Sequence, residues 1–155
     1  MKEPTILNGG LAVDDRGSVS FVNDFNFKNV KRFYQVQNHR RGFIRAWHGH
    51  KKEGKYVYVA AGTALVGAVP MPEYRFDDKV GAEIEVAKDT TPKTFVISAK
   101  SPKILYIPPN YANGFMNLED NTIIQFFSTS TLDESLGDDI RFEYDKWDIW
   151  KEDFR

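Results

Sequence analysis

The sequence contains no cysteine and shows no marked excess of charge of either sign. Without cysteine, the protein can have no disulfide bond, no cysteine-ligated zinc site and no thiol nucleophile. Its 155 residues include 21 Lys and Arg against 22 Asp and Glu, so that the net charge is −1. A chain this close to neutral has no electrostatic reason to bind nucleic acid or an anionic membrane surface. We therefore expect neither as a partner.

Long hydrophobic runs are also missing. The longest of them, such as Tyr56–Ala61, are far too short to span a bilayer. The first ten residues contain no apolar stretch of signal-peptide length. These two absences favour a cytoplasmic location. No linker, repeat or low-complexity segment divides the chain, and its length suits one compact domain, so we expect a single domain over residues 1–155.

Sustained helical periodicity is absent as well, and only Leu132–Leu136 suggests a helical turn. Short β-favouring runs recur instead, at a spacing of about 8–12 residues that is typical of antiparallel sandwiches and barrels. The predicted strands are Val19–Val22, Arg32–Gln37, Phe43–Trp47, Lys55–Ala60, Thr63–Val69, Glu83–Val86, Thr94–Ile97, Ile104–Ile107, Phe115–Leu118 and Thr122–Phe127. We expect the polar segment Met71–Thr91 to be an irregular excursion and the aromatic tail Trp147–Trp150 to pack back on the body.

Two of the three histidines, His48 and His50, lie two residues apart. In a strand both side chains would project from the same face, although two histidines on a polar surface turn are the simpler interpretation. Their surroundings resemble the first motif of the cupins. Gly42 stands six residues before His48, Gly62 closes the motif, and Lys55 takes the place of the glutamate ligand.

The second cupin motif is also present in outline. Its positions are occupied by Pro108, Asn110, Asn113 and Asn117, with Asn113 in the place of a histidine ligand. The resemblance to both motifs implies an all-β fold, a cupin-type antiparallel β-jelly roll (double-stranded β-helix), rather than a generic sandwich.

A metal site is disfavoured by the same comparison. A lysine ammonium has no lone pair to offer and repels a cation, and Lys55 and Asn113 replace two of the cupin ligands. We therefore expect no metal and no other cofactor. Glu53 could instead supply a third ligand, and a metal cupin such as a dioxygenase or a phosphosugar isomerase remains an alternative.

Three side chains of the first motif suit chemistry that needs no metal. A neutral His48 can remove a proton from carbon next to a ketone, and Lys55 can stabilise the enolate oxygen as charge develops there. Arg45 can bind a phosphate through two parallel hydrogen bonds. Taken singly, Lys55 could be a solvated strand end and Arg45 a surface ion pair. Together they indicate proton abstraction on a phosphorylated keto-sugar.

Several stretches resemble the dTDP-4-dehydrorhamnose 3,5-epimerase family: Asp15-Arg16-Gly17, Asn38, Gly42–His48, Gly54-Lys55 and Ile107–Phe115. The resemblance implies a metal-independent isomerase in deoxysugar and cell-surface polysaccharide biosynthesis. Its substrate would be a nucleotide-diphospho-4-keto-6-deoxy sugar, and the protein would be a homodimer.

The same resemblance implies a role for each site residue. His48 would remove the proton at carbon 3 or carbon 5, and Lys55 would stabilise the enolate. The side chains expected to contact the substrate are Arg16, Asn38, Arg45, Tyr106 and Asn113. Because the family keeps Arg and His three residues apart, a β-bulge between Arg45 and His48 is implied.

This chain departs from the family at the residue that acts as the proton donor. Phe126 stands where the family has the tyrosine that returns a proton, or Gln125 does if the alignment shifts by one residue. Tyr106, Tyr111 or water could act instead, or only one centre could be inverted. Asp148, with Asp153 as second choice, is the candidate for orienting His48.

His48-Gly49-His50-Lys51 and Arg32-Phe33-Tyr34 also resemble the dTDP-4-keto-6-deoxyhexose 3,4-ketoisomerases. In that alternative, His48 and His50 shuttle a proton between adjacent carbons. A non-catalytic cupin that binds sugar nucleotides is a third possibility. If Lys55 points inward, Tyr56 and Tyr58 point outward, where a partner subunit could cover them.

Overall fold

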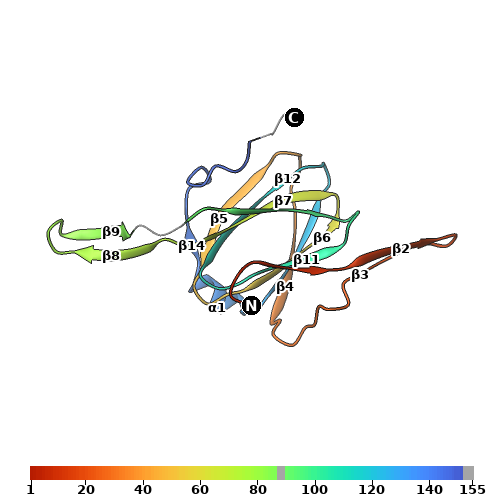
Figure 1. The fold of residues 1–155 in the computed structure, drawn as a ribbon, viewed down its shortest axis with the longest axis horizontal. Helices are drawn as coiled ribbons and strands as arrows, with labels where there is room; N and C mark the ends of the chain where they lie inside the picture. The colour runs from red at the N-terminus through yellow and green to blue at the C-terminus, as the bar shows by residue number, and fades with distance from the viewer. Residues whose placement is uncertain (87–89, 152–155) are drawn as a thin grey trace.

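The computed structural model describes residues 1–86 and 90–151, and within them the chain is almost entirely β-structure. Ten strands form two antiparallel five-stranded sheets that face each other (Figure 1). The first sheet has the order β1 (Thr5–Asn8), β11 (Lys103–Ile107), β6 (Lys55–Ala61), β13 (Ile123–Ser128) and β4 (Arg32–Gln37). The second has the order β10 (Lys93–Ser98), β7 (Thr63–Pro70), β12 (Tyr111–Asn117), β5 (Ile44–His50) and β14 (Ile140–Arg141).

The core lies between the two sheets because alternate residues of each strand face inward. On β6, Lys55, Val57 and Val59 are buried, while Tyr56 and Tyr58 are half-buried on the outer face, as the alternation predicted. The ring of Tyr56 lies 5.2 Å from that of Phe25 in the same chain. The outer tyrosines are therefore covered in part by the chain itself.

Two further hairpins project from opposite ends of this body (Figure 1). They are β2–β3 (Gly10–Asp14 and Gly17–Phe21) and β8–β9 (Glu73–Asp77 and Ala82–Val86). The described part of Met71–Thr91 is thus an excursion at one end, as predicted, and Glu83–Val86 is a strand in it, as predicted. The expectation that Glu73–Asp77 is irregular is wrong. Apolar and charged residues alternate along β8 and β9, and the turn between them is closed by the Asp77 carbonyl, which accepts the N–H of Gly81 at 2.8 Å. The charged residues of β8 hid its strand pattern from the sequence-based prediction.

The predicted strands and helical turn all correspond to observed elements, and α1 spans Leu132–Leu136. The aromatic tail also packs as predicted. Trp147 and Trp150 are buried against Trp47, with ring centroids 5.4 and 5.1 Å from it. Four strands were missed: β1, β2, β8 and β14. Across residues 1–86 and 90–151, no helix has the length and apolar character needed to cross a membrane.

Candidate active site

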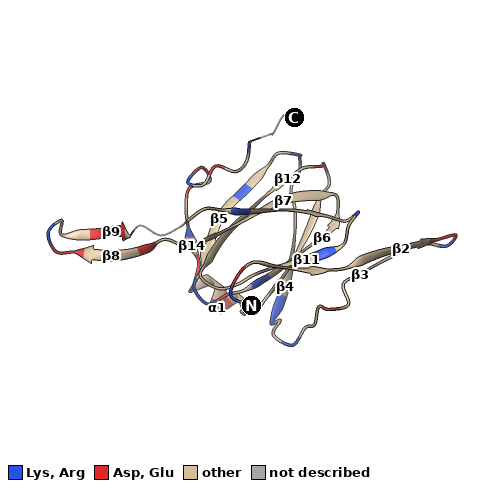
Figure 2. Cartoon of the chain, viewed as in Figure 1, with Lys and Arg blue, Asp and Glu red and all other residues tan. Residues whose placement is uncertain are grey.

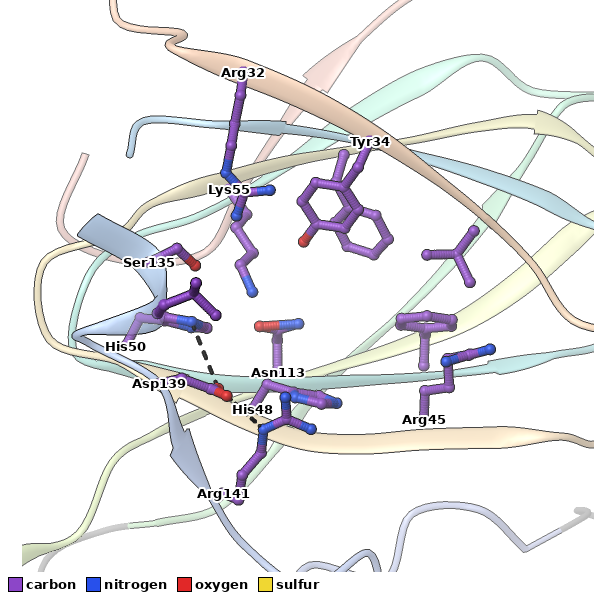
Figure 3. Close-up of a pocket in the computed structure, with 14 residues that line it drawn as sticks. Arg32, Tyr34, Arg45, His48, His50, Lys55, Asn113, Ser135, Asp139 and Arg141 are labelled. Carbon is purple, nitrogen blue, oxygen red and sulfur yellow. Dashed lines mark hydrogen bonds and ion pairs between the residues drawn. The ribbon is translucent and has the colours of Figure 1, made fainter. Parts of the chain in front are cut away.

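A cavity of about 240 Å³ opens between the two sheets at one end of the body. Its lining comes from β4, β5, β6, β12, β13, α1 and β14: Arg32, Tyr34, Val36, Arg45, His48, His50, Lys55, Asn113, Phe115, Phe126, Ser135, Leu136, Asp139 and Arg141 (Figure 3). Basic residues of β4, β5 and β6 converge here, although acidic and basic segments are interspersed over the chain as a whole (Figure 2). The cavity is therefore locally cationic in a neutral protein.

The predicted β-bulge is present in β5. Asn113 of β12 pairs with His48 and Phe115 pairs with Arg45, so that three steps on β5 match two on β12. The close approach requires glycine at position 114, where a Cβ would lie 2.5 Å from the Cβ of Ala46. The bulge lets Arg45 and His48 both line the cavity despite their odd spacing.

The imidazole of His48 is held neutral. Burial lowers its pKa to about 4, and the positive charges of Arg141 and Lys55 act in the same direction. Arg141 is the direct strand neighbour of His48 across the β14–β5 pair. At neutral pH the ring therefore has a free lone pair, as a general base requires.

Lys55 reaches into the cavity from the opposite sheet (Figure 3). It is 6% exposed, and burial lowers its pKa, while the negative charges of Glu53 and Asp139 oppose that shift. A lysine and a neutral histidine thus line the same cavity from opposite sheets. This arrangement suits removal of a proton by His48 while charge develops on an oxygen near Lys55.

His50 shares the inner face of β5 with His48, as the two-residue spacing predicted. Its Nε2 atom lies 3.0 Å from Glu53 and 3.8 Å from Asp139. Burial alone would raise the pKa of Glu53, but hydrogen bonds from His50 and two serines, with the charge of Lys55, lower it to about 2. Two carboxylates therefore surround His50, whereas cations surround His48.

The described residues contain no group of three or more His, Cys, Asp or Glu side chains arranged to hold a metal ion. Glu53, the alternative third ligand, accepts hydrogen bonds from Arg32 and His50. Its carboxylate is therefore already occupied by protein donors.

Arg45 and the two asparagines have different positions at the site. Asn113 lines the cavity and is buried. Asn38 lies behind Arg45 and accepts a hydrogen bond from its Nε atom at 2.7 Å. The Asn38 amide nitrogen in turn donates to Asn117 at 3.2 Å. Asn38 therefore fixes the orientation of Arg45, and does not itself line the cavity.

Three predicted site residues lie away from the cavity. Arg16 is at the tip of the β2–β3 hairpin, where it pairs with Asp14 and is 86% exposed. Tyr106 packs against Tyr56 on the outer face of the first sheet, with ring centroids 4.7 Å apart. Asp148 pairs with Lys151 at 2.8 Å in the tail. Asp153 lies outside the described residues.

Five polar residues of the cavity had no role predicted from the sequence: Arg32, Tyr34, Ser135, Asp139 and Arg141. Alternation along β4 places Arg32, Tyr34 and Val36 on one face, and that signal could have identified the first two. Burial raises the pKa of Tyr34, so that its hydroxyl stays protonated at neutral pH. Asp139, and not Asp148, is the tail carboxylate beside the histidines.

Comparison with known proteins adds two findings. The model of the dTDP-4-dehydrorhamnose 3,5-epimerase family matches residues 2–151. No curated protein matches the chain by sequence.

Solved structures of similar shape have low sequence identity. The dTDP-4-dehydrorhamnose 3,5-epimerase of Bacillus anthracis, solved with TDP and pyrophosphate bound, has a TM-score of 0.70 at 19% identity, over 94% of this chain and 85% of that one. A 3,4-ketoisomerase from Helicobacter canadensis has a TM-score of 0.65 at 19% identity, over 94% and 95%. The RmlC epimerase of Mycobacterium tuberculosis has a TM-score of 0.68 at 16% identity, over 88% of this chain and 66% of that one. These similarities confirm the predicted cupin-type jelly roll.

Proposed function

Because the chain belongs to the dTDP-4-dehydrorhamnose 3,5-epimerase family, we propose that it is an isomerase of a nucleotide-diphospho-4-keto-6-deoxy sugar. The observation that carries this proposal is that a neutral His48 and Lys55 line the same cavity from opposite sheets. No metal is needed for this chemistry, because the lysine supplies the positive charge that stabilises the enolate.

The reaction begins with the sugar ring between the two sheets. His48 takes a proton from the carbon beside the ketone, and the C–H electron pair becomes the carbon–carbon double bond of an enolate. The carbonyl oxygen then carries the negative charge next to Lys55. Tyr34 lies on the sheet opposite His48, and its protonated hydroxyl can return a proton to the other face of the ring (Figure 3). Return on that face inverts the carbon.

The nucleotide would lie at the mouth of the cavity. A volume of about 240 Å³ suits a sugar ring and is too small for the whole nucleotide sugar. Arg45 stands near the start of β5, where its side chain is exposed and is oriented by Asn38. It can therefore bind the diphosphate. The TDP and pyrophosphate bound to the Bacillus anthracis relative support a ligand of this class.

A 3,4-ketoisomerase is the second candidate, and one observation favours it. His50 lines the same cavity on the same strand face as His48. Two histidines on one side of the ring can pass a proton between adjacent carbons without inversion. The third possibility, a non-catalytic sugar-nucleotide-binding cupin, is weakened by Tyr34, which offers the hydroxyl that Phe126 lacks.

The proposal includes a homodimer in the cytoplasm. An isolated two-stranded hairpin is marginally stable in water, and β2–β3 exposes Val13 (71%) and Val19 (65%). A second copy of the chain would cover these residues. Arg16 at the tip of this hairpin is remote from the cavity of its own chain. It can bind substrate only in the cavity of another copy.

Incubation with dTDP-4-keto-6-deoxyglucose in heavy water tests the proposal. Proton NMR of the recovered sugar should show deuterium at carbon 3, at carbon 5 or at both. Inverted coupling constants would identify an epimerase, and a 3-keto product would identify a ketoisomerase. Binding with no exchange at any carbon would leave only the non-catalytic alternative.

A further inference from the structure

The proposed reaction gives no role to the buried carboxylate of Glu53. It does not line the cavity, and its side chain has an exposed fraction of 0%. Four side-chain donors converge on it. They are Arg32 Nη2 at 3.1 Å and Ser128 Oγ at 2.5 Å on Oε1, with His50 Nε2 at 3.0 Å and Ser135 Oγ at 2.8 Å on Oε2. A carboxylate is buried in this way only where its charge is satisfied.

The backbone around Glu53 is fixed as firmly as its side chain. The carboxylate of Asp138 accepts the backbone N–H groups of Lys51, Lys52 and Glu53 at 2.9, 2.8 and 3.1 Å. On the far side, the backbone N–H of Gly54 donates to the hydroxyl of Thr129 at 2.8 Å. The loop between β5 and β6 is therefore built to hold one carboxylate against one histidine.

We propose that Glu53 is a positioning residue that fixes His50 in a single orientation and with its hydrogen on Nε2, which makes His50 a second proton carrier of the cavity. This assignment rests on the proposed function. An ionised carboxylate can only accept, so the Nε2 atom at 3.0 Å must carry the hydrogen of that bond. Nδ1 is then the ring nitrogen with a free lone pair, and it can accept a proton without breaking the bond to Glu53.

The two histidines have different charged neighbours, and these suit them to different roles in the reaction. The positive charges of Arg141 and Lys55 favour a neutral His48, which accepts the proton from the sugar carbon. His50 faces two carboxylates instead, with its Nε2 atom 3.0 Å from Glu53 and 3.8 Å from Asp139. Nδ1 of His50 carries no proton at the start, so it first takes one from solvent and then passes it to the enolate. His48 keeps the proton that it removed and releases it to solvent after the product leaves, so both rings return to their starting state. The Nε2–H···Glu53 bond stays intact through both steps.

The substitution Glu53→Gln gives a sharp test because Arg32 can only donate. The amide oxygen must stay on the side of Arg32, so the amide N–H₂ faces His50. Nε2 must then accept, and the ring hydrogen moves to Nδ1. We expect nitrogen-15 NMR of the free protein to show a protonated Nε2 in the native chain and a protonated Nδ1 with bare Nε2 in the variant. With dTDP-4-keto-6-deoxyglucose, kcat should fall by about 10²-fold with little change in KM.

Ser128→Ala is the matched control. It removes a hydrogen bond from the same carboxylate, on the Arg32 side, and keeps the charge and the bond to His50. It should lower Tm but leave Nε2 protonated and kcat within a few-fold. If Glu53→Gln does not fold, Glu53→Asp replaces it, because the shorter side chain withdraws the carboxylate from His50. The same loss of kcat and of the hydrogen-bonded Nε2–H resonance is expected.

The NMR result does not depend on any substrate, so it separates this inference from the proposed function. A bare Nε2 in the native protein would overturn the inference, as would a Glu53→Gln protein that keeps both the Nε2–H and full kcat. Absence of deuterium exchange by the native protein would instead overturn the proposed function.

Discussion

Tyr34 and Phe126 are direct neighbours across the β4–β13 pair, and their rings stack with centroids 4.9 Å apart at an interplanar angle of 9°. Phe126 occupies the position at which the family resemblance led us to expect a tyrosine acid. The hydroxyl that it lacks is therefore supplied one strand away, on the same wall of the cavity. Neither Tyr106, which lies on the outer face, nor Tyr111 or Gln125 lines the cavity.

Exchanging the side chains of Tyr34 and Phe126 tests whether Tyr34 supplies the acid hydroxyl that Phe126 lacks. Tyr34→Phe keeps the stacked pair and removes only the hydroxyl, so proton abstraction at carbon 3 should continue in heavy water. Net conversion should fall by about 10²-fold, the scale of a positioned acid. Tyr34→Phe combined with Phe126→Tyr should recover most of the loss in a coupled turnover assay. Full activity of Tyr34→Phe alone would show that another group is the acid.

His48→Asn should abolish deuterium exchange and leave substrate affinity largely unchanged. Proton removal takes place only on the way to the transition state, so its loss falls on kcat. Calorimetric titration with the nucleotide diphosphate measures the affinity of the variant. A variant that loses only affinity would make His48 a binding residue and His50 the candidate base.

The acid limb of the pH profile should report His48. A base must be deprotonated, and the pKa of His48 in the free protein is about 4, so kcat/KM should rise up to about pH 4 and level off above it. After burial, the charge of Arg141 is the largest of the effects that lower this pKa. Arg141→Gln should therefore raise the pKa and move the limb to higher pH. An unmoved limb would mean that another group controls it.

Metal should have no part in turnover. Lys55 occupies the position of a cupin ligand and places a cationic group in the cavity, which repels a bound cation. Elemental analysis by plasma mass spectrometry should find no stoichiometric transition metal, and chelator treatment should leave activity unchanged. About one metal per chain, lost together with activity on chelation, would contradict this.

Mixing two inactive variants tests whether Arg16 serves a partner's cavity. In a dimer of Arg16→Ala with His48→Asn, one cavity would combine an intact His48 with an intact Arg16 from the other chain. An equimolar mixture that has exchanged subunits should therefore regain about a quarter of native activity. Sedimentation gives the oligomeric state as the control. A monomer at micromolar concentration, or no recovery in mixed dimers, would remove Arg16 from the site.

Period-two alternation is encoded locally, and for that reason the sequence predicted ten of the observed strands and which residues of each strand share a face. It placed Lys55 on the face of β6 opposite to Tyr56 and Tyr58, and both histidines on one face of β5, because neighbouring residues of a strand must point to opposite faces. The spacing of Arg45 and His48 likewise required a bulge, and one is present. These features depend on a few consecutive residues.

The tertiary structure alone decided which distant residues meet. The sequence suggested Asp148 as the carboxylate beside the histidines, but the pairing of β14 with β5 brings Asp139 and Arg141 there and leaves Asp148 with Lys151. Likewise, the register of β13 against β4 put Tyr34 beside Phe126, and the packing of α1 brought Ser135 to Glu53. Register between strands about 90 residues apart in the chain depends on the whole packed core, so no local pattern could reveal it.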